Sequence, residues 1–216
     1  HQEVAADDHR LELRVVDVRR DDGPAAGDLV AHELEVELGV LVVGGKKTVK
    51  PWPANIDDWP QYLNKADNNA VAHDQVVGPP RHYQWTSTPQ WSRAHLVLPS
   101  IQGLVSTNGR LFTIEDQASI EHPALPGEFT LVARDAFNGK LLWKREIPTW
   151  HNHLFGLKSG PAVLPRRLVA MDGKVYTTLG LDAPLVQLDA KTGRTLQEYA
   201  GTDGTTEILL DSGMLY

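Results

Sequence analysis

The chain has 216 residues, with 21 Lys and Arg against 28 Asp and Glu, a net charge of −7 and no cysteine. Without a clustered basic surface it is not expected to bind nucleic acid, and without cysteine it has no disulfide, thiolate zinc site or Cys nucleophile. It also lacks a run of about 18 apolar residues, so we predict no transmembrane segment.

Residues 1–49 are predicted to form an N-terminal segment that could be the tail of another domain. Its first 45 residues contain no Lys and no aromatic residue. Residues 11–18 alternate roughly between apolar and polar, as in a half-buried strand. Residues 29–43 suit a strand by their alternation and a helix by their glutamates, and Gly44-Gly45 ends that stretch.

Residues 50–99 are predicted to be an extended lead-in. Proline and tryptophan recur through it, at Pro51, Trp52, Pro53, Trp59, Pro60, Pro79, Pro80, Trp85 and Trp91. Proline breaks the hydrogen-bond ladder of a helix and restricts the residue before it. We therefore expect connections anchored by aromatic side chains, with one short strand around residues 82–86.

From residue 100 onward, short apolar runs alternate with glycine turns, and the pattern repeats. Residues 108–113 match residues 172–177, and a third copy begins at Ser212. Each copy reads as a two-residue turn followed by an alternating strand. Gly173 and Gly213 are 40 positions apart, which is close to one four-stranded propeller repeat of roughly 40–50 residues.

A second element also recurs, since residues 131–143 match residues 185–199. In both copies an Asp precedes a Gly by four positions, as Asp135-to-Gly139 and Asp189-to-Gly193. The carboxylate of such an Asp can accept hydrogen bonds from turn amides, and the glycine can take a positive φ without a Cβ clash. The equivalent glycines are 54 positions apart, and an insertion at residues 115–128 would explain this longer spacing.

Trp143 follows the first of these turns, on a strand expected to lie at the outer edge of its sheet. An aromatic side chain there can lie across the neighbouring sheet and bury a large area. In the second copy, Leu196 or Tyr199 stands near the position of this tryptophan.

The run from Ala133 to Trp143 resembles the tryptophan-docking motif of quinoprotein propellers, Ala-x-Asp-x-x-Thr-Gly-x-x-x-Trp, with Asn138 in place of Thr. The resemblance implies a blade-docking role for Ala133, Asp135, Gly139, Trp143, Asp189 and Gly193. It also implies an all-β fold, a partial β-propeller of quinoprotein-like four-stranded blades with an irregular N-terminal extension. Residues 50–99 would then hold the lead-in and a first partial blade, and residues 100–216 the following blades, cut at the C-terminus.

Residues 50–216 also resemble a bacterial group of propeller proteins with quinone-binding-like repeats. The resemblance is carried by residues 50–53, 57–59, 68–72, 78–81, 84–85 and 91–95. Many members of this group are labelled by analogy with the outer-membrane assembly lipoprotein, a propeller scaffold. The resemblance implies a binding or scaffold module in the periplasm or cell envelope, without a catalytic site in this chain.

The alternative is that the chain is part of a pyrroloquinoline quinone (PQQ)-dependent alcohol or sugar dehydrogenase. Such enzymes hold PQQ and calcium over the propeller axis, and many carry a vicinal disulfide that a chain without cysteine cannot form. PQQ and calcium are expected only under this alternative, and the sequence singles out no catalytic residue and no metal site.

Two groups of side chains are candidate ligand-binding residues. Trp91, Arg93 and His95 place an indole, a cation and an imidazole close together, which could bind an anionic or sugar-like ligand. His151 and His153 would share one face of an extended strand and could contribute to a metal site, although two more ligands would be needed. For both groups, ordinary packing or surface hydrogen bonding is the favoured interpretation.

The chain begins at His1 and stops at Tyr216, inside a predicted strand. We therefore expect native sequence to continue past Tyr216 and to precede His1. The expected partners are the remaining blades of the propeller and a protein or saccharide, and not a nucleic acid.

Overall fold

The computed structural model describes residues 40–43, 46–49, 53–76, 78–89, 100–119, 125–151 and 163–216. The chain divides into two compact units, His1–Glu33 and Leu34–Tyr216, and every described residue belongs to the second. Within it, strand β1 (Val40–Val43) pairs antiparallel with β2 (Lys46–Val49). The end of the ambiguous stretch 29–43 is thus a strand, and the rest of that stretch lies outside the described residues.

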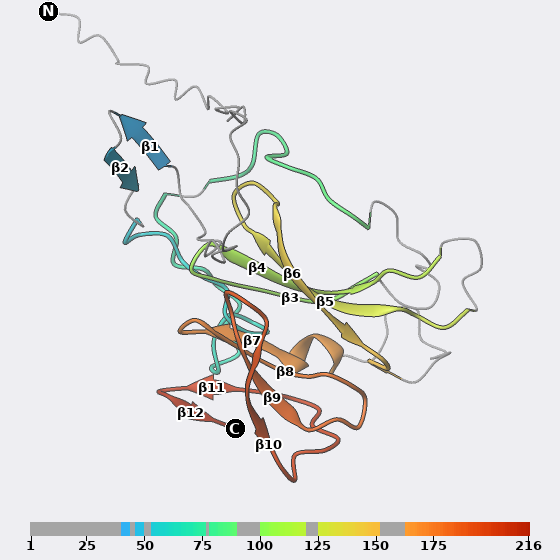
Figure 1. Cartoon of the computed structure of the whole chain (residues 1–216). Coiled ribbons are helices and arrows are strands. Elements are labelled where there is room, and N and C mark those ends of the chain that lie inside the picture. The colour runs from blue at the N-terminus through green and yellow to red at the C-terminus, as the bar shows by residue number, and fades with distance from the viewer. Residues whose placement is uncertain are drawn as a thin grey trace, which may run out of the picture. The chain divides into compact units, whose positions relative to one another are not determined.

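The remaining strands form two antiparallel four-stranded sheets and one hairpin (Figure 1). We call the first sheet blade 1, the second blade 2, and the hairpin the start of blade 3. Blade 1 contains β3 (Ile101–Thr107), β4 (Arg110–Asp116), β5 (Phe129–Asp135) and β6 (Leu141–Ile147), hydrogen-bonded in that order. Blade 2 follows the short 3-10 helix η1 (Leu164–Arg167) and contains β7 (Leu168–Met171), β8 (Lys174–Thr178), β9 (Leu185–Asp189) and β10 (Thr195–Tyr199). The start of blade 3 is β11 (Leu210–Asp211) with β12 (Met214–Leu215).

The first hairpin of each blade closes through the same two-residue turn. Asn108, Asp172 and Ser212 all have positive φ, between 48° and 52°, and the glycine that follows each has a φ between 71° and 78°. Two successive residues with positive φ define the turn whose twist matches that of the flanking strands. The predicted repeat of turn and strand is confirmed in all three copies.

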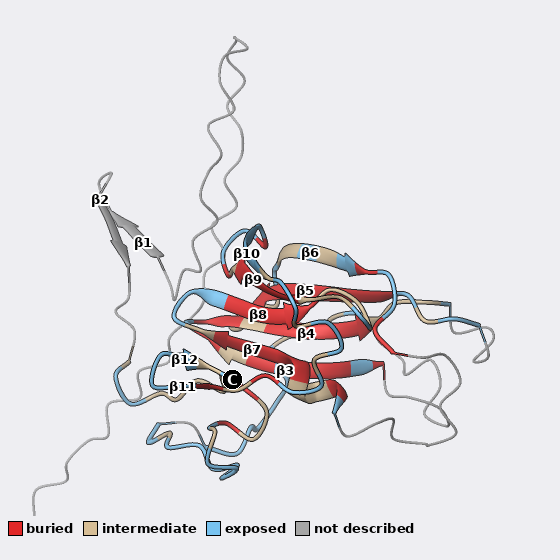
Figure 2. Ribbon diagram, turned by 90° about the horizontal axis from the view of Figure 1, so that it is seen from below, coloured by how far each residue is buried: buried red, intermediate tan, exposed pale blue. Residues whose placement is uncertain are grey.

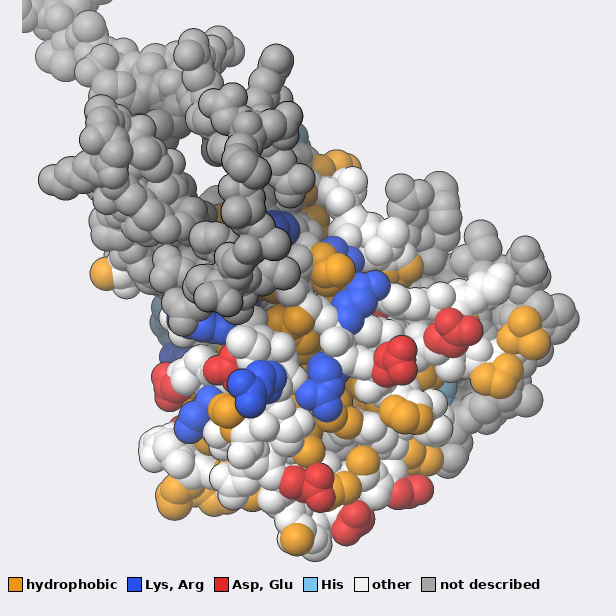
Figure 3. Space-filling model, viewed as in Figure 1, with side chains coloured by type: hydrophobic (Ala, Val, Ile, Leu, Met, Phe, Trp, Pro, Cys, Tyr) orange, Lys and Arg blue, Asp and Glu red, His pale blue; other side chains and the backbone are white. Residues whose placement is uncertain are grey.

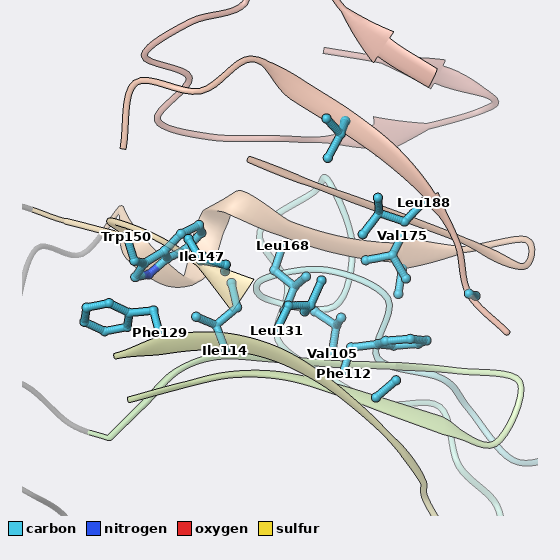
Figure 4. Close-up of a cluster of buried hydrophobic side chains, with 14 of the residues drawn as sticks. Val105, Phe112, Ile114, Phe129, Leu131, Ile147, Trp150, Leu168, Val175 and Leu188 are labelled. Atoms are coloured by element: carbon cyan, nitrogen blue, oxygen red, sulfur yellow. The ribbon is translucent and has the colours of Figure 1, made fainter. Parts of the chain in front are cut away.

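Alternating side chains bury both faces of blade 2. On one face, Leu168, Val175 and Leu188 join a core cluster shared with blade 1 (Figure 4). On the other face, Val169 and Tyr176 join a second cluster with residues of blade 3. Because side chains of a strand point alternately to its two faces, blade 2 packs between blade 1 and the start of blade 3.

Burial decreases from the middle of each blade to its last strand. Figure 2 shows buried residues concentrated in β4, β5, β7 and β8, whereas β6 and β10 are mostly intermediate or exposed. A stack of similar four-stranded antiparallel sheets, joined in chain order and packed face to face, is the architecture of propeller blades. The predicted all-β fold with a partial β-propeller is confirmed.

Two expectations about irregular segments had different outcomes. The predicted insertion at residues 115–128 is confirmed only from residue 117, since Glu115 and Asp116 belong to β4 and β5 begins at Phe129. The predicted strand around residues 82–86 was wrong, because no described residue of that stretch is in a strand. As shown below, a tryptophan side chain holds the stretch in place instead of a backbone ladder.

Candidate functional site

The indole of Trp143 joins blade 1 to blade 2. It extends from β6, and its Nε1 donates a hydrogen bond of 3.0 Å to the carbonyl oxygen of Ala190. A Cβ added to Gly193 would lie 2.7 Å from Cδ2 of this ring, closer than any side chain could pack. The indole therefore lies directly on the glycine in the turn between β9 and β10 of the next blade. We call the turn between the last two strands of a blade its outer turn.

Trp85 makes the same contact with blade 1. Its Nε1 donates a hydrogen bond of 2.9 Å to the carbonyl oxygen of Ala136, and a Cβ added to Gly139 would lie 2.6 Å from its ring. Sequence reasoning did not assign Trp85 this role. A signal was present, since Trp85 precedes Trp143 by 58 positions, close to the 54-residue repeat.

The turns beneath the two indoles are built alike around an aspartate. Asp135 Oδ1 accepts hydrogen bonds from the amides of Phe137 and Asn138, at 2.8 and 3.2 Å. Asp189 Oδ1 accepts from the amides of Lys191 and Thr192, at 3.1 and 2.8 Å.

The second turn also shows what the Thr-to-Asn difference changes. Thr192 Oγ1 donates a hydrogen bond of 2.8 Å to Asp189, whereas Asn138 Oδ1 accepts from the Lys140 amide at 2.8 Å. Burial acts to raise the pKa of Asp189, but the hydrogen bonds from Thr192 and Lys191 outweigh it, so this pKa lies below its usual value.

The register of the outer strands gives two further results. Ala133 lies opposite Trp143 within blade 1 and is not the acceptor of an indole. The carbonyls that accept from the two indoles are those of Ala136 and Ala190. In blade 2, a bulge between Thr195 and Gln197 aligns Gln197 with Gln187. Because positions 187 and 133 are equivalent in the repeat, Gln197 holds the place of Trp143, and Leu196 and Tyr199 flank it.

Arg145 adds a second link between the blades. Its Nη1 donates a hydrogen bond of 2.6 Å to the carbonyl oxygen of Gly193 and lies 3.3 Å from Thr195 Oγ1. Arg145 shares a face of β6 with Trp143, two positions away. The same outer turn of blade 2 is therefore held by an indole and a guanidinium.

Three consecutive residues of the lead-in bind the first strands of three blades. Trp59 bridges to Ser106 of β3, with the Ser106 amide 2.8 Å from the Trp59 carbonyl. The Ala170 amide of β7 donates to the Pro60 carbonyl at 2.7 Å, and the Leu210 amide of β11 donates to Gln61 Oε1 at 3.0 Å. We call residues 57–67, which contain these three, the inner segment.

A cavity of about 290 Å³ lies between the inner segment and the turn of blade 3. Its walls carry four carboxylates, one ammonium, two amides and several apolar side chains: Asp57, Asp58, Pro60, Gln61, Asn64, Lys65, Ala66, Asp67, Met171, Leu210, Asp211 and Ser212. This mixture of polar groups over an apolar surface is typical of ligand sites. It is the candidate functional site of the described chain.

The two adjacent aspartates of the inner segment have opposite pKa shifts. The backbone amide of His73 donates to Asp57 Oδ2 at 2.7 Å and holds the pKa of Asp57 below its usual value. Burial raises the pKa of Asp58, although the Asn108 amide, 3.1 Å from Asp58 Oδ2, acts in the opposite direction. Asp58 thereby ties the inner segment to the first turn of blade 1.

The candidate residues from the sequence do not form this site. Trp91, Arg93, His95 and His153 lie outside the described residues. His151 is buried beside Phe129, with the two ring centroids 4.8 Å apart.

A buried cation close to His151 was not anticipated. The Arg167 guanidinium lies 3.7 Å from the centroid of the Trp150 ring and donates to the Trp150 carbonyl. Burial lowers the pKa of Arg167 to about 10. Its interaction with the indole face offsets part of the penalty for burying the charge, which gives this pair a structural role in the blade 1–blade 2 core.

Surface charge, acidic clusters and helix length were compared over the described residues. On the face seen in Figure 3, basic and acidic side chains both occur among apolar ones, without a continuous basic surface. Within the described ranges, no group of three or more His, Cys, Asp or Glu side chains could hold a metal ion. The same ranges contain no helix long and apolar enough to cross a membrane.

Comparison with known proteins gives likeness in structure but not in sequence. No protein-family model and no curated protein sequence matches the chain. Among solved structures, the chain is similar to a "Europium-containing methanol dehydrogenase", with a TM-score of 0.35 and 18% sequence identity. The match covers 58% of this chain and 21% of the dehydrogenase chain. At these values the likeness decides neither activity nor cofactor, and the assignment of the fold rests on the two four-stranded sheets and their repeated turns.

Proposed function

We propose that this chain is a propeller module that acts as a binding scaffold of the cell envelope. The observation that carries the proposal is the inner segment, in which Trp59, Pro60 and Gln61 bind the first strands of three successive blades. In a propeller the blades surround a central channel. Under this proposal the inner segment would line the edge of such a channel, where it would serve both stability and ligand binding.

The contacts between blades support the scaffold role. Trp85 and Trp143 fix the outer turns, while the inner segment fixes the first strands. Blades held at both edges form a rigid platform, and a rigid platform presents loops with little loss of conformational entropy on binding. The cell-envelope location rests on the resemblance of residues 50–95 to bacterial envelope propellers.

The described residues do not fit PQQ and calcium at this edge of the channel. The main-chain donors of Ala170 and Leu210 already bind Pro60 and Gln61. The acidic side chains of the described ranges also do not converge as three or more ligands. We therefore place the PQQ-dependent dehydrogenase second.

The dehydrogenase assay decides between the two functions. The native full-length protein would be incubated with PQQ and CaCl₂, desalted, and assayed with an artificial electron acceptor on alcohols and sugars. A scaffold is expected to retain no quinone absorbance and to show no turnover, with a quinoprotein dehydrogenase reconstituted in parallel as the positive control. Turnover that depends on PQQ would overturn the proposal. Cell fractionation tests the location, and recovery in the cytosolic fraction alone would contradict it.

A further inference from the structure

The cavity beside the inner segment contains two buried amide side chains that are each only half satisfied. Gln61 is 2% exposed and Asn64 is 1% exposed. Gln61 Oε1 accepts from the Leu210 amide, and Asn64 Nδ2 donates to the Val71 carbonyl at 2.8 Å. No hydrogen bond among the described residues reaches Gln61 Nε2 or Asn64 Oδ1. Neither atom is among the fully buried unpaired atoms of the described residues, so both are accessible although their side chains are buried. Since both residues line the cavity, this donor and this acceptor can pair with a polar molecule there.

The carboxylates of the cavity show the same pattern. Asp58 Oδ2 accepts from the Asn108 amide and the Thr107 hydroxyl. Asp67 Oδ1 accepts from the Asn69 amide, and Asp211 Oδ2 accepts from the Ser212 hydroxyl. Within the described ranges, the second oxygen of each carboxylate has no hydrogen-bond partner. Each carboxylate is thus held in place by the protein with one oxygen left for a ligand.

The charge of the walls selects the sign of that ligand. Four aspartates face a single ammonium, that of Lys65, so the cavity has an excess of three negative charges when all are ionised. These carboxylates are spread along the wall and do not gather as three ligands of a metal ion. Met171, Leu210 and Pro60 add apolar surface between them. An organic cation with a hydroxylated carbon frame matches this arrangement better than a bare metal ion.

We propose that the cavity binds a small hydroxylated amine, a molecule the size of a monosaccharide that carries a primary ammonium and several hydroxyl groups. The ammonium would donate to the free aspartate oxygens, and the hydroxyl groups would pair with Gln61 Nε2 and Asn64 Oδ1. A volume of about 290 Å³ admits one such ring. This inference rests on the proposed binding function and names the class of ligand.

The test compares three probes of similar size on the full chain by calorimetry. Glucosamine carries both features, glucose lacks the charge, and cyclohexylamine lacks the hydroxyl groups. Glucosamine is expected to bind at least about fivefold more tightly than either, since one charge-assisted contact at a partly exposed site contributes about 1 kcal/mol. Equal affinity for glucose or for cyclohexylamine, or displacement of glucosamine by CaCl₂ at equal concentration, would overturn the proposal.

A matched pair of variants ties the binding to this cavity. Asp211 is exposed and lines the cavity, whereas Asp203 is exposed and lies outside it. Asp211→Asn keeps an acceptor for Ser212 and is expected to weaken glucosamine about threefold to tenfold, while Asp203→Asn leaves the affinity unchanged. An equal effect of both variants would show a nonspecific charge effect and refute the site.

Failure of this inference can be told from failure of the proposed function. If no probe binds and PQQ gives no turnover, the ligand class is wrong and the scaffold function still holds. If PQQ gives turnover, the scaffold function is wrong, whatever the probes bind.

Discussion

Gly193 meets two separate constraints, one on its backbone and one on its missing side chain. Its φ is +70°, and a Cβ there would lie 2.7 Å from the Trp143 ring. Gly173 has nearly the same φ, +74°, but a Cβ there would have no atom within 4 Å. The two glycines of blade 2 therefore separate the effect of a positive φ from the effect of indole docking.

Gly193→Ala is expected to destabilise the protein by about 2–5 kcal/mol, and Gly173→Ala by about 1–2 kcal/mol. The loss for Gly173→Ala comes from the strain of a residue with a Cβ at positive φ. The loss for Gly193→Ala includes the same strain and also the displacement of the Trp143 indole. Urea unfolding followed by tryptophan fluorescence measures both. If the two variants lose the same stability, the close approach of Trp143 to Gly193 contributes nothing.

At the scale of single elements, an extended stretch can be fixed by one side chain in place of a strand ladder. Residues 78–89 contain no strand, yet Trp85 from this stretch binds blade 1 as Trp143 of β6 binds blade 2. The stretch thus occupies the place that an outer strand takes between successive blades.

Trp85→Ala is expected to destabilise the protein by about 2–4 kcal/mol, because it removes the packing of the indole and leaves the Ala136 carbonyl unpaired. Tyr83→Ala is the control, since Tyr83 is 90% exposed and its loss should change stability by less than about 0.5 kcal/mol. Limited proteolysis adds a local readout, with faster cleavage near residue 81 in the Trp85 variant alone. Similar unfolding midpoints for the two variants would contradict the docking role.

The elements that sequence patterns could predict are those set by local chemistry. The turns at Gly109, Gly173 and Gly213 follow from backbone preferences, and the strands after them follow from alternation. The position of Gln197 could not be predicted, because a bulge in β10 shifts the register without a distinctive sequence. The predicted strand at residues 82–86 failed because this stretch is held by the docked indole of Trp85 and not by pairing with a neighbouring strand.

At the scale of the whole molecule, the inner segment could not be predicted at all. Gln61 binds the Leu210 amide across 149 positions of sequence, and no local pattern encodes such a contact. The cavity was missed for the same reason, since its walls come from the lead-in, β7 and the turn of blade 3. The sequence drew attention to Trp91–His95 and His151 because their residue types are chemically distinctive, whereas the cavity uses ordinary aspartates and amides.

Gln61→Leu is expected to lower stability by about 1–3 kcal/mol, because the buried Leu210 amide would lose its acceptor. Hydrogen exchange should speed up at the Leu210 amide and stay slow at Ala170, whose acceptor is the Pro60 carbonyl. Gln75→Leu is the control, since the Gln75 side chain is exposed. Unchanged exchange at Leu210 in the Gln61 variant would show that Gln61 does not hold the start of blade 3.

The inner segment also sets an order of events during synthesis. Residues 59–61 leave the ribosome before any of the strands that they bind, and their last partner, Leu210, is made 149 positions later than Gln61. Contacts between distant parts of a chain form slowly, since the loop between them must close first. The Trp- and Pro-rich lead-in therefore waits with its apolar side chains uncovered, and a nascent chain of this kind is exposed to aggregation until the hairpin of β11 and β12 emerges.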